Sequence, residues 1–218
     1  MIQDMPKIES PFYREMVKVQ KGRYDLPSVY ICVPKINPDY EWVFTDPNVK
    51  AIEKLHGTNV SIVVAEGSIT SIWNRTARIP FFNKGKKFIT EALLNSHDRG
   101  YCELEDGQWF GEVIGPRVNG NPYHLEEHLW IPFKTYGWEK LAYKSWESGK
   151  YPKTYEAIRE WFKTLMPLFT LRVHGKEATD KHFVEGVVFT HPDGRMAKLR
   201  VDMFDFYTGR RHNKEEEQ

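Results

Sequence analysis

Few cysteines and the absence of long apolar runs set the first limits on this chain of 218 residues. Its two cysteines, Cys32 and Cys102, lie far apart in the sequence, which argues against a disulfide framework and favours a reducing compartment. No apolar run approaches the 18 residues of a membrane-spanning helix, and no secretory signal is present. We therefore expect a soluble, cytoplasmic and monomeric protein that does not associate with a membrane.

The chain also lacks a strong charge of either sign. Its 31 Lys and Arg residues are nearly balanced by 30 Asp and Glu residues, so the net charge does not indicate a nucleic-acid binder. A local basic face remains possible. Hydrophobic residues make up 40% of the chain, which is enough for a sizeable core and excludes a disordered protein. Neither an internal repeat nor a low-complexity linker is present, and the length fits one large or two small domains.

Apolar periodicity predicts mostly strands. Turn signals at Gly67 and at His191–Gly194 predict two antiparallel hairpins, and two segments have apolar residues at helical spacing. The predicted strands are 29–33, 51–54, 60–65, 68–74, 109–114, 130–135, 184–190 and 195–201, and the predicted helices are 85–95 and 155–166. The sequence therefore predicts an α+β fold in which antiparallel strands dominate.

Chemistry is first indicated by the segment Glu53–Asn59 (EKLHGTN), which lies between two predicted strands. A lysine amine can attack the α-phosphorus of a nucleoside triphosphate and hold the nucleotide as a phosphoramidate. Gly57 would let the backbone turn and come close to that nucleotide. K-x-x-G alone is common, since Lys134–Gly137 matches it too, and a surface lysine before a turn glycine is the simple alternative.

Four further blocks follow Lys54 in order. They are Asn74–Arg78 (NRTAR), Phe110–Glu112 (FGE), Glu185–Phe189 (EGVVF) and Lys198–Arg200 (KLR). Together they resemble the covalent nucleotidyltransferase superfamily of DNA ligases, RNA ligases and mRNA capping enzymes. The superfamily's first motif is K-x-D-G, whereas this chain reads K-x-H-G-x-N, which is similar to the RNA ligase 2 family.

The resemblance implies a mainly antiparallel nucleotidyltransferase (adenylyltransferase) domain of the ATP-dependent ligase type. We expect it over residues 1–206, with 1–50 as its N-terminal part and 207–218 as a polar tail. Relatives carry a second domain after the fifth motif, but fewer than twenty residues follow Arg200. We therefore expect no C-terminal accessory domain.

The resemblance also implies catalytic roles. Lys54 would be the nucleophile, and Glu185 would hold a divalent metal, Mg²⁺ or Mn²⁺, and position Lys54. Lys198 and Arg200 would be catalytic cations, since nearby positive charge favours a neutral, nucleophilic amine. They are two residues apart on a predicted strand and should share a face, which could also be an ordinary solvated basic face. Arg200 replaces the usual second lysine, and its planar fork is not equivalent to an ammonium.

ATP recognition is implied for a second set of residues. Glu53 would accept the adenine amino group, which favours ATP over GTP, and Glu112 would contact the ribose. Phe133 is our best match to the aromatic that stacks on the base, with Trp130 as a rival and core packing as the alternative. The residues expected to contact ATP are Glu53, Lys54, Arg75, Glu112, Phe133, Lys198 and Arg200.

His56, Asn59 and Arg75 lie where relatives engage phosphates and RNA ends, although residues of these types in turns often make only local hydrogen bonds. The eight histidines show no zinc spacing with cysteine, and His124 with His128 is expected on a helix or loop surface.

The resemblance as a whole predicts an ATP-dependent RNA ligase. Lys54 would take AMP from ATP, AMP would pass to a 5′-phosphate end of RNA, and a 3′-hydroxyl would then seal that end. The alternatives are an ATP-dependent DNA ligase, which His56 in the place of Asp disfavours, and a catalytically silent module that binds nucleic-acid ends.

Overall fold

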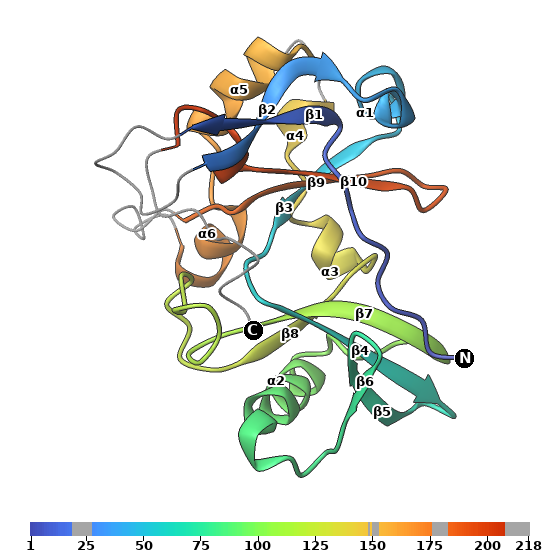
Figure 1. Ribbon diagram of the computed structural model, residues 1–218. Coiled ribbons are helices and arrows are strands. Elements are labelled where there is room, and N and C mark those ends of the chain that lie inside the picture. The colour runs from blue at the N-terminus through green and yellow to red at the C-terminus, as the bar shows by residue number, and fades with distance from the viewer. Residues whose placement is uncertain (19–27, 148, 150–152, 176–182, 208–218) are drawn as a thin grey trace. The chain divides into compact units, whose positions relative to one another are not determined.

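The computed structural model describes residues 1–18, 28–147, 149, 153–175 and 183–207 (Figure 1). The chain forms two compact units, each assembled from segments that are far apart in the sequence. Unit 1 comprises Met1–Lys7, Leu55–Ala142 and Pro167–Phe183, and unit 2 comprises Ile8–Lys54, Tyr143–Met166 and Val184–Gln218. The predicted polar tail lies outside the described residues from residue 208 onward.

A five-stranded antiparallel sheet forms the framework of unit 1, in the order β6-β5-β4-β7-β8. Its strands are β4 (Thr58–Ala65), β5 (Ser68–Asn74), β6 (Ala77–Ile79), β7 (Gly107–Ile114) and β8 (Leu129–Pro132). Val60, Ile62 and Val64 alternate along β4 and are all buried in one hydrophobic cluster. The predicted hairpin of β4 with β5 is confirmed.

Helix α2 (Lys87–Asp98) packs on the core side of this sheet. Its buried residues Ile89, Ala92 and Leu93 recur at helical spacing and join the cluster that contains β4. The Ser96 hydroxyl accepts a hydrogen bond of 2.8 Å from the backbone N–H of Trp130, which ties the helix to β8. The predicted helix begins at residue 87 rather than 85, because Lys84–Lys86 form a 3-10 turn (η2).

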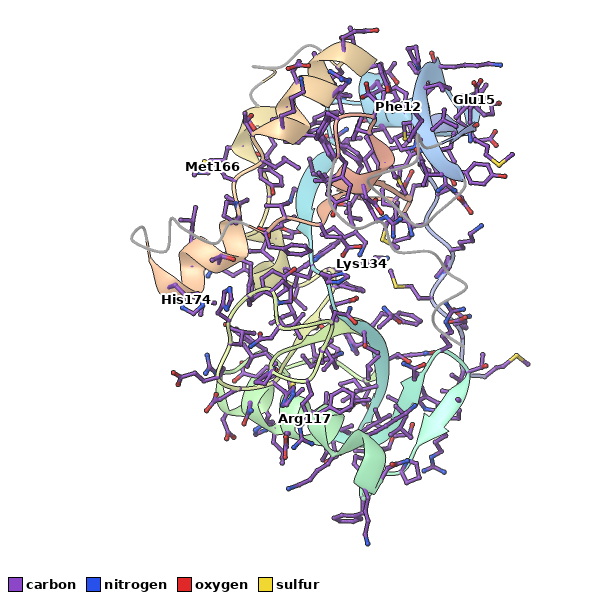
Figure 2. The ribbon with its side chains drawn as sticks, turned by 60° about the vertical axis from the view of Figure 1, so that its left-hand side comes forward. Phe12, Glu15, Arg117, Lys134, Met166 and His174 are labelled. Atoms are coloured by element: carbon purple, nitrogen blue, oxygen red, sulfur yellow. The ribbon has the colours of Figure 1, made fainter. Side chains whose placement is uncertain are left out.

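Two short helices complete unit 1, α3 (Tyr136–Glu139) and α6 (Leu168–His174). Thr135 caps α3, so the second K-x-x-G match, Lys134–Gly137, is a turn followed by a helix start. His174, labelled in Figure 2, ends α6 and places a ring nitrogen 2.8 Å from the carbonyl oxygen of Tyr123.

Unit 2 contains two separate antiparallel sheets. The larger has the strand order β10-β9-β3, formed by β3 (Lys50–Lys54), β9 (Gly186–Thr190) and β10 (Met196–Arg200). The smaller pairs β1 (Phe12–Lys18) with β2 (Ser28–Ile36). The predicted hairpin of β9 with β10 is confirmed, and so is the predicted α+β fold dominated by antiparallel strands.

Aromatic side chains build the core of unit 2. Trp146 stacks on Trp161 at 5.6 Å between ring centroids and contacts Phe189 of β9 at 4.8 Å. These residues come from α4 (Lys144–Glu147), α5 (Tyr155–Lys163) and β9. Three further short helices of unit 2 are η1 (Pro38–Tyr40), α1 (Trp42–Thr45) and η3 (Val201–Met203). The helix predicted to reach residue 166 ends at Lys163, where the backbone N–H of Thr164 closes a tighter turn onto Trp161.

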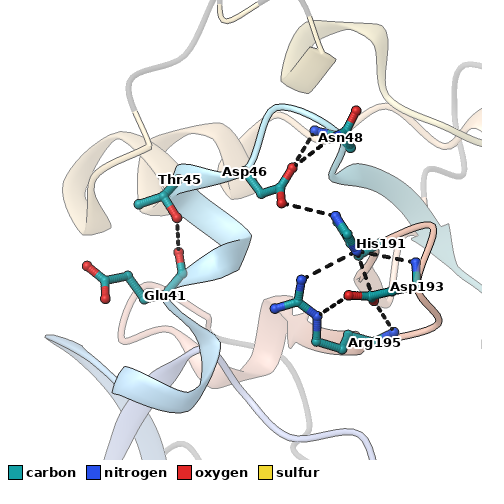
Figure 3. Close-up of polar contacts among 7 residues, drawn as sticks. All are labelled: Glu41, Thr45, Asp46, Asn48, His191, Asp193 and Arg195. Carbon is teal, nitrogen blue, oxygen red and sulfur yellow. Dashed lines mark hydrogen bonds and ion pairs between the residues drawn. The ribbon is translucent and has the colours of Figure 1, made fainter.

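A polar clasp, defined as Asp46, His191, Asp193 and Arg195, joins the residue after α1 to the β9–β10 turn (Figure 3). The His191 ring lies 3.0 Å from an Asp46 oxygen and 2.8 Å from an Asp193 oxygen. The backbone N–H of Arg195, followed by the His191 and Arg195 side chains, lowers the pKa of Asp193 to about 2. The carboxylate therefore stays ionised at neutral pH.

Two further expectations need correction. The predicted strand 130–135 ends at Pro132, because the chain turns at Lys134, whose φ is +60°. His128 is buried rather than on the surface: its ring accepts the backbone N–H of Arg117 at 3.1 Å, and desolvation lowers its pKa. Strand β1 was not predicted at all.

None of the helices in the described part of the chain has the length and apolar character needed to span a membrane.

Trp130→Phe should lower the free energy of unfolding by about 2–3 kcal/mol, because it opens a cavity and removes a buried donor. The Trp130 side chain is fully buried, and its indole N–H donates to the Val60 carbonyl at 3.0 Å. Denaturant titration would measure the loss. Trp109→Phe is the matched control: its indole also donates to a backbone carbonyl, but the site is only partly buried. Equal losses in both variants would contradict the assignment of Trp130 to the core.

Candidate active site

The register of the three-stranded sheet brings three basic residues to one face of unit 2. Lys54 pairs with Gly186, which pairs on its other side with Arg200. In the row two residues away, Ile52 pairs with Val188, and Val188 pairs with Lys198. Directly opposed and alternate residues point to the same face of a sheet. The prediction that Lys198 and Arg200 share a face is confirmed, and Lys54 lies on that face too.

Gly186 allows the strands of this row to approach closely. A Cβ atom at Gly186 would lie 2.1 Å from the carbonyl oxygen of Leu199 and 2.6 Å from the Cα of Arg200. Both contacts are with backbone, which cannot swing away as a flexible side chain could. The glycine of the EGVVF block is therefore required by the distance between β9 and β10.

Glu185 forms an ion pair with Lys54. The Lys54 Nζ lies 2.7 Å from Glu185 Oε2, and the two side chains are 21% and 13% exposed. The backbone of Glu185 is also held, because its carbonyl oxygen accepts the N–H of Val201 at 2.9 Å. A short, half-buried, charge-assisted hydrogen bond of this kind orients the amine.

Glu53 points away from Lys54. Adjacent residues of a strand alternate between faces, so Glu53 shares its face with Val187 and Leu199, which are fully buried. The Glu53 side chain is itself 0% exposed. A buried carboxylate is costly, so Glu53 is not the solvated strand end that its position next to a turn would allow.

In unit 1, Glu112 lies on β7 directly opposite Asn59 of β4. Its Oε1 accepts the backbone N–H of Gly57 at 3.0 Å, so the carboxylate holds the loop that follows Lys54. The Asn59 amide lies 3.5 Å from the Gly111 carbonyl and 3.1 Å from the sulfur of Met5. The structure thus brings Glu112, Gly57 and Asn59 together within one unit.

Two residues of this loop network were missed by sequence reasoning. The Tyr123 hydroxyl accepts the backbone N–H of His56 at 2.7 Å, and the Asn119 amide donates to the Gly57 carbonyl at 2.9 Å. The His56 ring also lies 5.3 Å from that of Phe183. Asn119 lies in a turn-rich stretch, which is its only sequence signal. In the structure its φ is +46°, a value that asparagine adopts more readily than most residues.

The remaining predicted residues differ in accessibility. Phe133 directly follows β8, is half-buried, and packs its ring 5.4 Å from that of Trp138. Trp130, its rival as the stacking aromatic, is wrong for that role, because it is fully buried with its indole N–H bonded inside the core. Arg75 is exposed at the turn between β5 and β6, with a φ of +54°.

Glu185 fits a divalent metal as a single carboxylate ligand. Among the described residues, no group of three or more His, Cys, Asp or Glu side chains could hold a metal ion. Mg²⁺ and Mn²⁺ often bind through one or two carboxylates and complete their shells with water and phosphate oxygens. A partly exposed carboxylate beside the lysine matches that pattern.

The chain matches the model of the family described as RNA ligase over residues 48–204, which is well over half of its length. This range begins just before β3 and ends just after η3, so it contains all five sequence blocks. None of the curated proteins compared with the chain matches it.

Solved structures of a Naegleria gruberi RNA ligase are similar to the chain at low identity. A lysine-to-alanine variant with ATP and Mn is 14% identical with a TM-score of 0.48, covering 91% of this chain and 58% of that one. An aspartate-to-alanine variant without ligand is 14% identical with a TM-score of 0.47, covering 90% and 61%. The chain therefore spans less than two thirds of the length of these relatives.

Gly186→Ala should destabilise the protein by about 1–3 kcal/mol, as overpacking does when backbone must shift. The added methyl group would push β10 away from β9 and displace Arg200. Gly137→Ala is the control, because the nearest atom to its added methyl group would be 4.0 Å away. Thermal melting of both variants tests this. A melting temperature of Gly186→Ala equal to that of the wild type would show that the strands do not approach as described.

Proposed function

This chain belongs to the RNA ligase family, and we propose that it is an ATP-dependent RNA ligase that works through a covalent AMP intermediate on Lys54. The observation that carries the proposal is the 2.7 Å ion pair of Lys54 with Glu185, next to a sheet face that also carries Lys198 and Arg200. An amine held by a carboxylate and accompanied by fixed cations suits attack on a phosphate.

In the first proposed step, Lys54 Nζ attacks the α-phosphorus of ATP. The new bond is N–P, the bond to the bridging oxygen breaks, and pyrophosphate leaves. The amine must also lose a proton, and the Glu185 carboxylate lies within hydrogen-bond reach of it. Glu185 is thus proposed both to orient the nucleophile and to assist its deprotonation.

Lys198 and Arg200 are proposed to offset the negative charge of the phosphoryl group during its transfer. Catalysis of phosphoryl transfer depends mainly on positioning and on fixed positive charge, because the protein has little covalent chemistry to perform. Their position on the Lys54 face supports this role.

In the second proposed step, an oxygen of an RNA 5′-phosphate attacks the same phosphorus, and Lys54 leaves with its electron pair. In the third step, a 3′-hydroxyl attacks the activated 5′-phosphate, the phosphodiester forms, and AMP leaves. His56, Asn59 and Arg75 are proposed to bind the RNA ends. The exposure of Arg75 supports a phosphate contact there.

Nucleoside recognition is proposed for Glu53, Glu112 and Phe133. Accepting the adenine amino group would require Glu53, which is 0% exposed, to open to the base, whereas Glu112 would bind the ribose and Phe133 would stack on the base. A carboxylate accepts several hydrogen bonds, so the bond from Gly57 to Glu112 is compatible with a ribose contact. The half-buried ring of Phe133 supports a stacking role.

We propose that Glu185 would also hold a divalent metal, Mg²⁺ or Mn²⁺. When bound, such an ion would neutralise phosphate charge on ATP. The single carboxylate beside Lys54 supports this assignment.

Lys54→Ala should abolish covalent labelling of the protein by α-³²P-ATP, because it removes the nucleophile. Mass spectrometry of wild-type protein treated with ATP and Mg²⁺ should find one AMP on Lys54. Lys134→Ala is the matched control, since Lys134 begins the other K-x-x-G segment and should leave labelling intact. An adduct on a different lysine would sink the assignment.

The same Lys54→Ala variant should still seal RNA whose 5′-phosphate already carries AMP, because the third step does not use the amine as nucleophile. Gel analysis of pre-adenylylated RNA would measure this, with Glu185→Ala expected to fail. If Lys54→Ala is folded but inactive in an assay where wild-type protein seals, the proposed division of roles is wrong. Sealing of DNA but not RNA would favour a DNA ligase, and no labelling at all would favour a silent end-binding module.

A further inference from the structure

Asp202 makes a local ion pair with one of the proposed catalytic cations. Arg200 is the last residue of β10, and the chain then turns into η3, which folds Asp202 back toward it. The Nη2 of Arg200 lies 3.0 Å from Asp202 Oδ2, and the side chains are 29% and 15% exposed. The carboxylate therefore engages one end of the guanidinium from a position only two residues away.

The segment that carries Asp202 is anchored on both sides. The backbone N–H of Val201 donates to the Glu185 carbonyl at 2.9 Å, and the side chains of Met203 and Phe204 are buried at 3% and 0% exposure. The Phe204 ring packs 4.9 Å from that of Phe162 on α5. A carboxylate held in this way cannot easily follow a moving arginine, so it fixes the arginine instead.

Two atoms of these ion-paired side chains, one donor and one acceptor, are buried away from solvent. Within the described part of the chain, neither Arg200 Nε nor Asp202 Oδ1 has a hydrogen-bond partner, although both atoms are buried. A buried N–H without a partner costs free energy, so Arg200 is held in this orientation against a local cost. No ligand can reach the buried Nε itself, but the Arg200 side chain is 29% exposed, and phosphate oxygens are the acceptors that a guanidinium group matches best.

We infer that Asp202 is a positioning residue, which fixes the guanidinium of Arg200 so that its exposed part is offered to a phosphate oxygen of the nucleotide. The inference rests on the proposed function, since it deepens the role given to Arg200 there. A lysine at this position would be a flexible point charge and would not need a fixed plane, whereas the planar fork of arginine binds well only in one orientation. Asp202 supplies that orientation.

Binding of α,β-methylene-ATP, whose α-phosphorus has no cleavable bridging oxygen, tests the inference without requiring turnover. Asp202→Ala and Arg200→Ala should each weaken binding about tenfold, and the double variant should be no weaker than either, because coupled residues are not additive. Asp202→Asn keeps a hydrogen-bond acceptor of the same shape and should retain binding within about threefold. The rate of Lys54 adenylylation by ATP should follow the same pattern.

Asp205→Ala is the matched control. It also removes a carboxylate that pairs with an arginine, Arg159, but on an exposed part of the same segment, and it should leave both measurements within about twofold. Additive losses in the double variant, or binding by Asp202→Ala as tight as that of the wild type, would overturn the inference. A different result would contradict the proposed function itself. In that case wild-type protein would never be labelled by ATP, although analogue binding would still show coupling between Asp202 and Arg200.

Discussion

The antiparallel register of β3, β9 and β10 is the constraint on which the proposed chemistry depends. Lys54 and Arg200 flank Gly186 in one row, and Lys198 follows two residues away on the same face. Because strand side chains alternate with a period of two, a slip of one residue would turn either Lys54 or both cations to the opposite face. Glu53 would then exchange places with the nucleophile. The chemistry is therefore specified by hydrogen bonding between strands as much as by the identity of the side chains.

Two devices at opposite ends of the sheet hold this register. At the Lys54 end, Gly186 lets the backbones approach so closely that any side chain would collide with β10. At the other end, the clasp formed by Asp46, His191, Asp193 and Arg195 ties the approach to β3 to the β9–β10 turn (Figure 3). A short hairpin sheet has little intrinsic preference for one register, so packing and end contacts must supply it.

Much of this arrangement could be predicted from local sequence patterns, and the failures have a common cause. Period-two alternation was enough to place Lys198 and Arg200 on one face, and turn residues were enough to predict both hairpins. The roles of Tyr123 and Asn119 were not predicted, because each contacts the Leu55–Gly57 loop from more than sixty residues away in the sequence. No local signal marks such a contact. His128 was placed on the surface because polarity alone does not reveal a partner such as the Arg117 backbone.

The electrostatics of the sheet face explain why acidic residues accompany its cations. Lys54 and Arg200 would repel each other if left bare, and each instead has a carboxylate nearby, Glu185 at 2.7 Å and Asp202 at 3.0 Å. These carboxylates come from the segment before β9 and the segment after β10, which are joined by the hydrogen bond from Val201 to the Glu185 carbonyl. One backbone contact therefore fixes both partners. Removing either carboxylate would take a close anionic neighbour from a half-buried cation, so the orientation and the charge of this face are set by the two short segments that this hydrogen bond joins.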